Sequence, residues 1–288
     1  MEWRGRRQSE NVEDRRGRRI PGGAAGLSGA GIVIVLVVSL LTGQNPLKLL
    51  ESMSGSQSAS APAEGQPYQE TAEENELSQF VRVVLADTED IWGEIFQKEV
   101  GRPYEKPILV LFTDAVQSGC GNAQSQMGPF YCPADHQLYI DLSFYQELRS
   151  RFGAPGDFAQ AYVIAHEVGH HVQNLLGVSD KAHAAEESAS ESGANAISVR
   201  VELQADCYAG VWANRTQAQK KVMEQGDLEE AIGAAQAVGD DRLQTQTQGR
   251  VVPESFTHGT AEQRAHWFEA GFSSGDMKRC DTFAPGVP

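Results

Sequence analysis

The sequence of 288 residues has little positive charge, few cysteines and no internal repeat. Its formal net charge is −15, so it lacks the basic face that binding to nucleic acid requires. Hydrophobic residues make up 40% of the chain and charged residues 22%, a composition typical of globular proteins rather than disordered chains or membrane bundles. We therefore expect a mostly globular, acidic protein that does not bind nucleic acid.

Cysteine is scarce, and no two cysteines have the Cys-x-x-Cys spacing that is typical of zinc clusters. A loop rich in glycine and proline separates Cys120 from Cys132, which favours a local disulfide between them. Cys207 would then pair with Cys280. All four cysteines lie in the part of the chain that we expect outside the cytoplasm, where disulfides persist.

Charged residues are absent from residue 20 to residue 47, and residues 31–41 are almost continuously apolar. About 20 apolar residues suffice to cross a bilayer as a helix. Seven arginines precede this stretch, and basic flanks stay in the cytoplasm. We therefore expect a cytoplasmic tail over residues 1–23 and one transmembrane signal anchor over residues 24–43. A cleaved signal peptide is the alternative, but no cleavage site with small residues directly follows Leu41.

Small and polar residues dominate 44–72, which predicts a flexible linker. Apolar residues then recur at helical spacing, and two short apolar runs, 108–113 and 137–142, are typical of buried strands. Further helices are expected at 143–151, 157–176, 194–214, 228–238 and 261–272. We therefore expect a domain over residues 73–288 of the α+β class, mostly helical with a small β-sheet.

The string His166-Glu167-Val168-Gly169-His170 is the strongest chemical signal. Histidines four apart project from one face of a helix, so both can bind a single Zn²⁺. Glu167 can hydrogen-bond a zinc-bound water and take its proton, the arrangement of metal-assisted hydrolysis. Two surface histidines on an ordinary helix are the alternative.

A hydrolytic zinc needs a third protein ligand and an open fourth position. Gln173 and Leu176 stand where a metzincin has glycine and histidine, which excludes that class. Glu202 and Asp206 are four apart on an expected helix, so we expect Glu202 to bind zinc and Asp206 to orient a ligand histidine. The other candidate ligands are Asp206 itself and three residues of a polar stretch, His183, Glu187 and Glu191.

His258 lies in an expected loop with Gly259 and Thr260. A histidine beside a zinc site can stabilise the oxyanion that forms during hydrolysis. A structural or capping histidine is the alternative.

These motifs resemble the neutral zinc metallopeptidases of bacteria, a membrane-anchored family. The resemblance covers almost the whole chain and rests on residues 87–92, 118–121, 129–133, 166–171, 202–210 and 255–260. The spacing of Glu202 and Asp206 is also similar to that of the gluzincins, in which the glutamate binds zinc. The resemblance implies a zincin-like fold, one Zn²⁺ per chain and a peptide or protein substrate. It also implies a place in the bacterial inner membrane, with the catalytic domain in the periplasm.

The sequence therefore predicts a zinc metallopeptidase anchored in the bilayer by one helix. Zinc-bound water, activated by Glu167, would attack the peptide bond without a covalent intermediate. The alternative is a membrane-tethered binding or scaffold module whose metal is absent or structural. A closed site with four protein ligands would favour the scaffold, and an open position would favour the enzyme.

Overall fold

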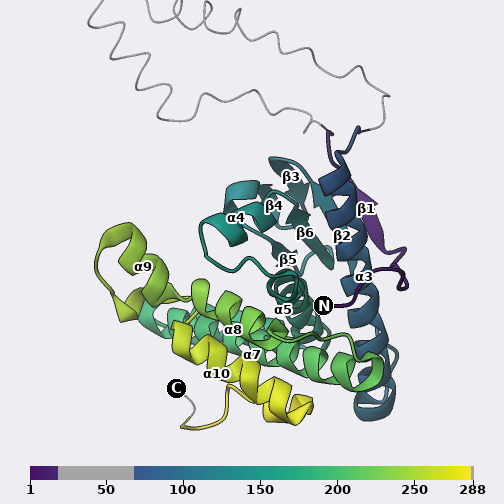
Figure 1. Cartoon of the computed structure of the whole chain (residues 1–288). Helices are drawn as coiled ribbons and strands as arrows, with labels where there is room; N and C mark the ends of the chain where they lie inside the picture. Colours follow the sequence, from purple (N-terminus) through teal and green to yellow (C-terminus); the bar gives the residue numbers. More distant parts are fainter. Residues whose placement is uncertain (19–67, 287–288) are drawn as a thin grey trace, which may run out of the picture. The chain divides into compact units, whose positions relative to one another are not determined.

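The computed structural model describes residues 1–18 and 68–286 (Figure 1). Contacts divide the chain into two units, and Met1–Arg18 belongs to the same unit as Glu70–Pro288. The expected membrane anchor over 24–43 and most of the expected linker over 44–72 lie outside the described residues. Within the described ranges, no helix is both long enough and apolar enough to cross a bilayer.

A small mixed sheet forms one layer of the first unit. Its order is β1 (Val12–Asp14), β2 (Ile108–Phe112), β6 (Gln137–Asp141) and β5 (Phe130–Cys132). β2 pairs in parallel with β1 and with β6, whereas β5 is antiparallel to β6 at the edge. β2 and β6 are the two expected strands. A separate hairpin joins β3 (Ala115–Ser118) to β4 (Gly121–Gln124).

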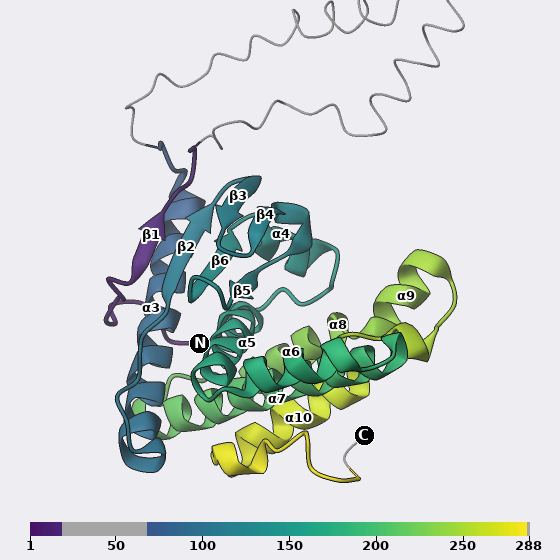
Figure 2. The ribbon, with the colours of Figure 1, turned by 180° about the vertical axis from the view of Figure 1, so that it is seen from behind.

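The helices form most of the remaining structure, which confirms the expected α+β class. They are α3 (Ala72–Ile95), α4 (Phe144–Ser150), α5 (Asp157–Leu175), α6 (Val178–Ser188), α7 (Glu191–Lys220), α8 (Asp227–Ala237), α9 (Asp240–Gln248) and α10 (Ala261–Ser274). Neither α6 nor α9 was expected, because each exposes most of its residues and lacks an apolar stripe. Seen from behind, α6 lies along the first half of α7 (Figure 2).

α5 is the central helix of the unit. It contacts β5 and β6 of the sheet, α3, and the helical layer made by α7 and α8. Its side chains are buried almost continuously from Phe158 to Gln173, so polar groups on this helix face the interior. A metal site built on α5 is therefore shielded from bulk water on most sides.

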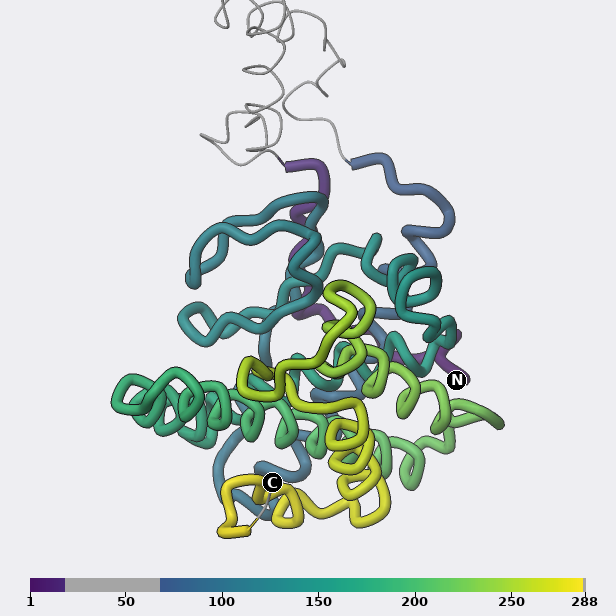
Figure 3. The backbone as a smooth tube through the Cα atoms, turned by 90° about the vertical axis from the view of Figure 1, so that its left-hand side faces the viewer, coloured from purple at the N-terminus to yellow at the C-terminus, as the bar shows by residue number. Residues whose placement is uncertain are grey.

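Residues 1–18 are part of this folded unit (Figures 1 and 3). β1 adds a strand beside β2, and Trp3 is buried with its ring 5.6 Å from that of Phe80. Arg7 lies 3.1 Å from the buried carboxylate of Glu89, and Asn11 donates to the same carboxylate at 2.7 Å. The expected division, a separate tail over 1–23 and a domain over 73–288, therefore leaves out a strand of the sheet. No local pattern identified this strand, because it has only three residues and pairs with a segment almost 100 positions away.

Both expected disulfides are present. Cys120, in the turn between β3 and β4, is bonded to Cys132 at the end of β5. Cys207, in the middle of α7, is bonded to Cys280 in the C-terminal segment. Each disulfide therefore fixes an irregular segment against a regular element.

Candidate metal centre

A close crossing of α5 and α7 brings the candidate residues together. A Cβ atom on Gly169 would lie only 2.9 Å from the carbonyl oxygen of Ala205, so the two backbones are in direct contact at this point. His166 and His170 lie on α5 around this contact, and Glu202 lies on α7. The glycine in the middle of the motif therefore allows the side chains of both helices to meet.

His166, His170 and Glu202 form a tight group of possible metal ligands. The two Nε2 atoms are 3.2 Å apart, His166 Nε2 is 3.2 Å from Glu202 Oε2, and His170 Nε2 is 3.4 Å from Glu202 Oε1. Ligands at ~2.0–2.1 Å from a tetrahedral zinc ion are themselves about 3.3 Å apart. The spacing of the two nitrogens and of the carboxylate therefore fits three zinc ligands and leaves one corner of the tetrahedron without a ligand from this group.

The hydrogen bonds of both histidines turn their Nε2 atoms toward this group. His166 Nδ1 lies 2.8 Å from Asp206 Oδ1, and His170 Nδ1 lies 2.9 Å from Gln173 Oε1. A carboxylate or amide oxygen can only accept, so each Nδ1 is the donor. In the neutral rings Nε2 then carries the free lone pair, as a metal ligand must.

Asp206 is the centre of a buried polar network beside His166. Tyr162 donates to it at 2.5 Å, and Arg264 on α10 donates through Nε at 2.8 Å and through Nη2 at 3.0 Å. Burial by itself would raise the pKa of Asp206, but the charge of Arg264 and the hydrogen bond from His166 hold it below its usual value. Asp206 therefore stays ionised and can hold the His166 ring.

Tyr162, Gln173 and Arg264 are the residues of this site that sequence reasoning missed. Tyr162 lies one turn before His166 and Gln173 lies one turn after His170, so helical spacing offered a signal for both. Arg264 lies 58 positions after Asp206 and has no local signal. Only the packing of α10 against α7 places it there.

Glu167 and Glu202 differ in their electrostatic surroundings. Burial raises the pKa of Glu167, although the nearby histidines partly offset this. Burial has the same effect on Glu202, but its contacts with His170 and His166 hold its pKa well below the usual range. Glu202 is thus suited to bind a cation, and Glu167 to accept and release a proton.

The structure places His258 outside the group of three. Asp240 Oδ2 accepts the backbone N–H groups of Thr257, His258 and Gly259 at 2.6–3.1 Å, and Asp240 Oδ1 lies 3.3 Å from His258 Nδ1. The hydrogen bond with Asp240 raises the pKa of His258, and the charge of Glu202 contributes to this rise. Asp240 therefore fixes both the loop and the ring, a role that sequence reasoning also missed.

The other histidines and rival ligands lie elsewhere. His183 and Glu187 are exposed on α6, 3.5 Å apart, and Glu191 is exposed at the start of α7. His171 is buried, with Nδ1 3.1 Å from the Tyr131 hydroxyl and Nε2 2.7 Å from the Glu105 carbonyl oxygen. The structure therefore brings none of these rivals to the candidate centre.

A second cluster of carboxylates, Asp157, Asp227 and Glu230, also has its oxygens close together. The amino group of Met1 lies 2.6 Å from Asp157 and 3.3 Å from Asp227. This cluster is thus already paired with a positive charge, and we assign no metal to it.

Comparison with known proteins agrees with a zinc site in this chain. The family model described as "Putative neutral zinc metallopeptidase" matches residues 1–283. The chain is 50% identical to "Uncharacterized protein YpfJ" of Escherichia coli (strain K12), over the full length of both. It is 49% identical to "Uncharacterized protein Rv2575" of Mycobacterium tuberculosis (strain ATCC 25618 / H37Rv), which covers 63% of this chain and 64% of that protein. No solved structure matches. The chain therefore belongs to the putative neutral zinc metallopeptidase family, as the sequence motifs indicate.

Proposed function

We propose that this protein is a zinc-dependent metallopeptidase that hydrolyses peptide bonds in peptide or protein substrates. The observation that carries the proposal is the mutual spacing of 3.2–3.4 Å among the ligand atoms of His166, His170 and Glu202. Three protein ligands leave an open position, which supports an enzyme over a closed structural site. Glu167 is buried on the same helix and interacts electrostatically with His166, His170 and Glu202, which supports a role in proton transfer at this centre.

His166, His170 and Glu202 would hold the zinc ion. When bound, zinc supplies a Lewis acid that polarises the substrate carbonyl and makes water more acidic. Glu167 takes the proton of the attacking water and then delivers it to the leaving amine, which its raised pKa favours. His258, oriented by Asp240, donates a hydrogen bond to the oxyanion.

The test of this function separates metal binding from turnover. Glu167→Gln should keep about one zinc ion per chain, because Glu167 is not among the proposed ligands. Peptide hydrolysis should fall by roughly 10²–10⁴-fold or more, the range usual for general acid–base groups, because glutamine cannot take up or release the proton. Zinc content by atomic absorption and cleavage of a fluorogenic peptide library give both values.

Glu187→Gln is the matched control, since it makes the same change on the exposed helix α6. It should leave zinc content and hydrolysis unchanged. Normal hydrolysis by Glu167→Gln would contradict the proposed enzyme.

We also propose that residues 24–43 attach the protein to the bacterial inner membrane and that the domain lies in the periplasm. The two disulfides support an exported domain. Residues 1–18 pack within that domain, which supports placing both on the same side of the membrane. In place of the expected cytoplasmic tail, we therefore propose that residues 24–43 enter the membrane without crossing it, because a single crossing between residues 18 and 70 would separate β1 from β2.

A further inference from the structure

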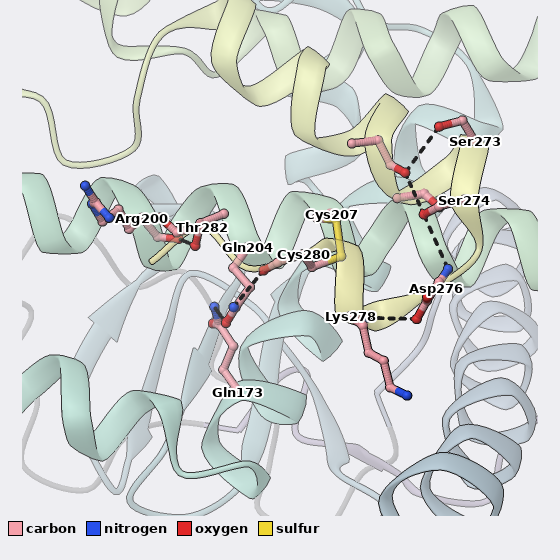
Figure 4. Close-up of a disulfide and its surroundings, with 12 residues drawn as sticks. Gln173, Arg200, Gln204, Cys207, Ser273, Ser274, Asp276, Lys278, Cys280 and Thr282 are labelled. Carbon is pink, nitrogen blue, oxygen red and sulfur yellow. Dashed lines mark hydrogen bonds between the residues drawn. A yellow bond between two sulfur atoms is a disulfide. The ribbon is translucent and has the colours of Figure 1, made fainter. Parts of the chain in front are cut away.

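Two buried glutamines, Gln173 on α5 and Gln204 on α7, lie between His170 and the C-terminal segment. Their exposed fractions are 0% and 6%, so each unsatisfied amide group would destabilise the fold. Gln173 Oε1 lies 2.9 Å from His170 Nδ1, and Gln173 Nε2 lies 3.1 Å from Gln204 Oε1. Gln204 Nε2 donates to the carbonyl oxygen of Cys280 at 2.8 Å (Figure 4). Hydrogen bonds therefore connect the histidine to Cys280 without interruption.

Two backbone carbonyl groups fix the donor and the acceptor of every hydrogen bond between His170 and Cys280. The carbonyl oxygens of Cys280 and Val201 can only accept, so the amide nitrogens of Gln204 and Gln173 face them. Gln204 Oε1 then accepts from Gln173, and Gln173 Oε1 faces the ring of His170. His170 must donate from Nδ1, which leaves its Nε2 lone pair toward the metal centre.

The Cys207–Cys280 disulfide fixes the Cys280 carbonyl group, at which this row of hydrogen bonds ends. Cys207 lies one turn after Gln204 on α7, so its bond to Cys280 keeps that residue over the same face of the helix. One turn before Gln204, the Thr282 hydroxyl donates to the Arg200 carbonyl oxygen at 2.7 Å, and Arg200 Nη1 donates to the Thr282 carbonyl oxygen at 3.1 Å (Figure 4). The C-terminal segment is therefore fixed along one stripe of α7.

The other ligand histidine has a separate support. His166 is held by Asp206, whose charge is balanced by Arg264 from α10. Asp206 takes no part in the glutamine chain. A change at the disulfide should therefore act on His170 and spare the contact between His166 and Asp206.

We propose that Gln173 and Gln204 are positioning residues that couple the tautomer and orientation of His170 to the Cys207–Cys280 disulfide. Loss of this disulfide then weakens zinc binding, although neither cysteine touches the metal centre. The proposal rests on the proposed zinc site, but the state of the His170 ring can be measured in the zinc-free chain as well.

The first test replaces Gln204 with methionine in the full-length protein. Gln204→Met keeps a long side chain of similar volume and removes the hydrogen bonds of Gln204 with Gln173 and with the Cys280 carbonyl oxygen. Zinc affinity, measured by competition with a chelator, should fall about 10–100-fold, the range found for residues that orient metal ligands. In this variant only the Val201 carbonyl still holds the Gln173 amide, and the other buried N–H of Gln173 loses its acceptor. The ¹⁵N signals of His170 in the zinc-free protein should therefore change from the Nδ1–H tautomer to a mixture, while thermal unfolding stays cooperative.

The second test removes each disulfide in turn. The double substitution Cys207→Ser/Cys280→Ser should give the same loss of zinc affinity and the same mixture of His170 tautomers. Cys120→Ser/Cys132→Ser is the matched control, because that disulfide has no bond to either glutamine, and it should leave both readouts unchanged. Adding Gln204→Met to Cys207→Ser/Cys280→Ser should cause no further loss, since both changes break the same chain.

Two results would overturn the proposal. One is a folded Gln204→Met protein with unchanged zinc affinity and a single His170 tautomer. The other is full additivity of the two losses, which would show independent effects. If the wild-type protein binds no zinc, the proposed function fails, and the His170 tautomer alone then decides whether the glutamine chain positions the ring.

Discussion

At the scale of single residues, Glu202 and Asp206 of α7 have different roles although they lie only four residues apart. Glu202 offers both oxygens to the histidines of α5, whereas Asp206 binds the far side of the His166 ring. The exposed fraction of Asp206 is 0%, and that of Arg264 is 3%. Removal of one partner of such a pair leaves an uncompensated buried charge.

Alanine substitutions should separate the two tasks. Glu202→Ala should abolish tight zinc binding, because it removes one of three ligands. Asp206→Ala should weaken zinc binding roughly 10–100-fold and destabilise the fold by about 3–5 kcal/mol, because Arg264 stays buried without its partner. Zinc titration and urea unfolding measure the two effects. Tight zinc binding by Glu202→Ala, with complete loss in Asp206→Ala, would show that the two roles are reversed.

His171 makes the stability of the fold depend on pH, independently of the metal. Burial lowers its pKa from 6.5 to about 4 in the folded protein. His171 therefore takes up a proton near pH 6.5 in the unfolded chain but only near pH 4 in the folded protein. Its contribution to the free energy of unfolding is fully present above pH 6.5. It falls as the pH drops from 6.5 to 4, by about 3 kcal/mol in total.

His171→Gln should remove this contribution, because glutamine does not titrate. Urea unfolding of zinc-free wild type and variant, at pH 7.5 and at pH 4, measures the difference. The wild type should lose about 3 kcal/mol more than the variant over this range. Equal losses in both proteins would show that His171 does not carry the effect.

At the scale of elements, glycines set the distances between helices. Gly169 allows the contact of α5 with α7, and Gly271 allows the contact of α10 with α7, where a Cβ would lie 2.0 Å from the Cys207 carbonyl oxygen. The first contact places Glu202 against the ligand histidines. The second brings α10 close enough for Arg264 to reach Asp206. Each polar contact therefore depends on a close approach of backbones elsewhere on the same pair of helices.

Gly169→Ala should show which effect dominates at this crossing. Alanine favours a helix over glycine by about 1 kcal/mol, but its Cβ would meet the Ala205 backbone at 2.9–3.1 Å. The helices must therefore separate, so zinc affinity and thermal stability should both fall.

Gly233→Ala on α8 is the matched control for this prediction. A Cβ there meets nothing within 4 Å, so this variant should be as stable as the wild type or more stable by up to about 1 kcal/mol. Zinc affinity of Gly169→Ala equal to that of Gly233→Ala would contradict the role of the crossing.

At the scale of the whole molecule, residues 1–18 tie the start of the chain to the domain. The buried Glu89 accepts from Ser9 and Asn11 and pairs with Arg7 and Lys106. Burial opposes ionisation of Glu89, but these contacts hold its pKa below the usual value. The N-terminal segment therefore supplies partners that this buried carboxylate needs.

Cysteine labelling tests whether both parts share one side of the membrane. Arg4→Cys and Lys181→Cys each place a thiol at an exposed position, one in the N-terminal segment and one on α6. In cells with a permeabilised outer membrane and an intact inner membrane, a membrane-impermeant maleimide should label both. Labelling of Lys181→Cys alone, with Arg4→Cys reacting only after lysis, would place the two parts on opposite sides.

Local sequence determined the helix of His166 and His170, the shared helix face of Glu202 and Asp206, the strands β2 and β6, and both disulfide pairings. Each follows from side-chain spacing along one element or from elimination among four cysteines, so no knowledge of distant packing was needed. The family assignment rests on a match over residues 1–283.

Tertiary structure alone decided which distant groups complete the site. β1 pairs with a strand almost 100 residues away, Arg264 reaches Asp206 from another helix, and Asp240 holds the loop of His258. The connection from His170 through Gln204 to Cys280 likewise joins separate elements. Such contacts depend on how closely the backbones of packed helices and strands approach one another, and no periodicity within a single segment records that distance.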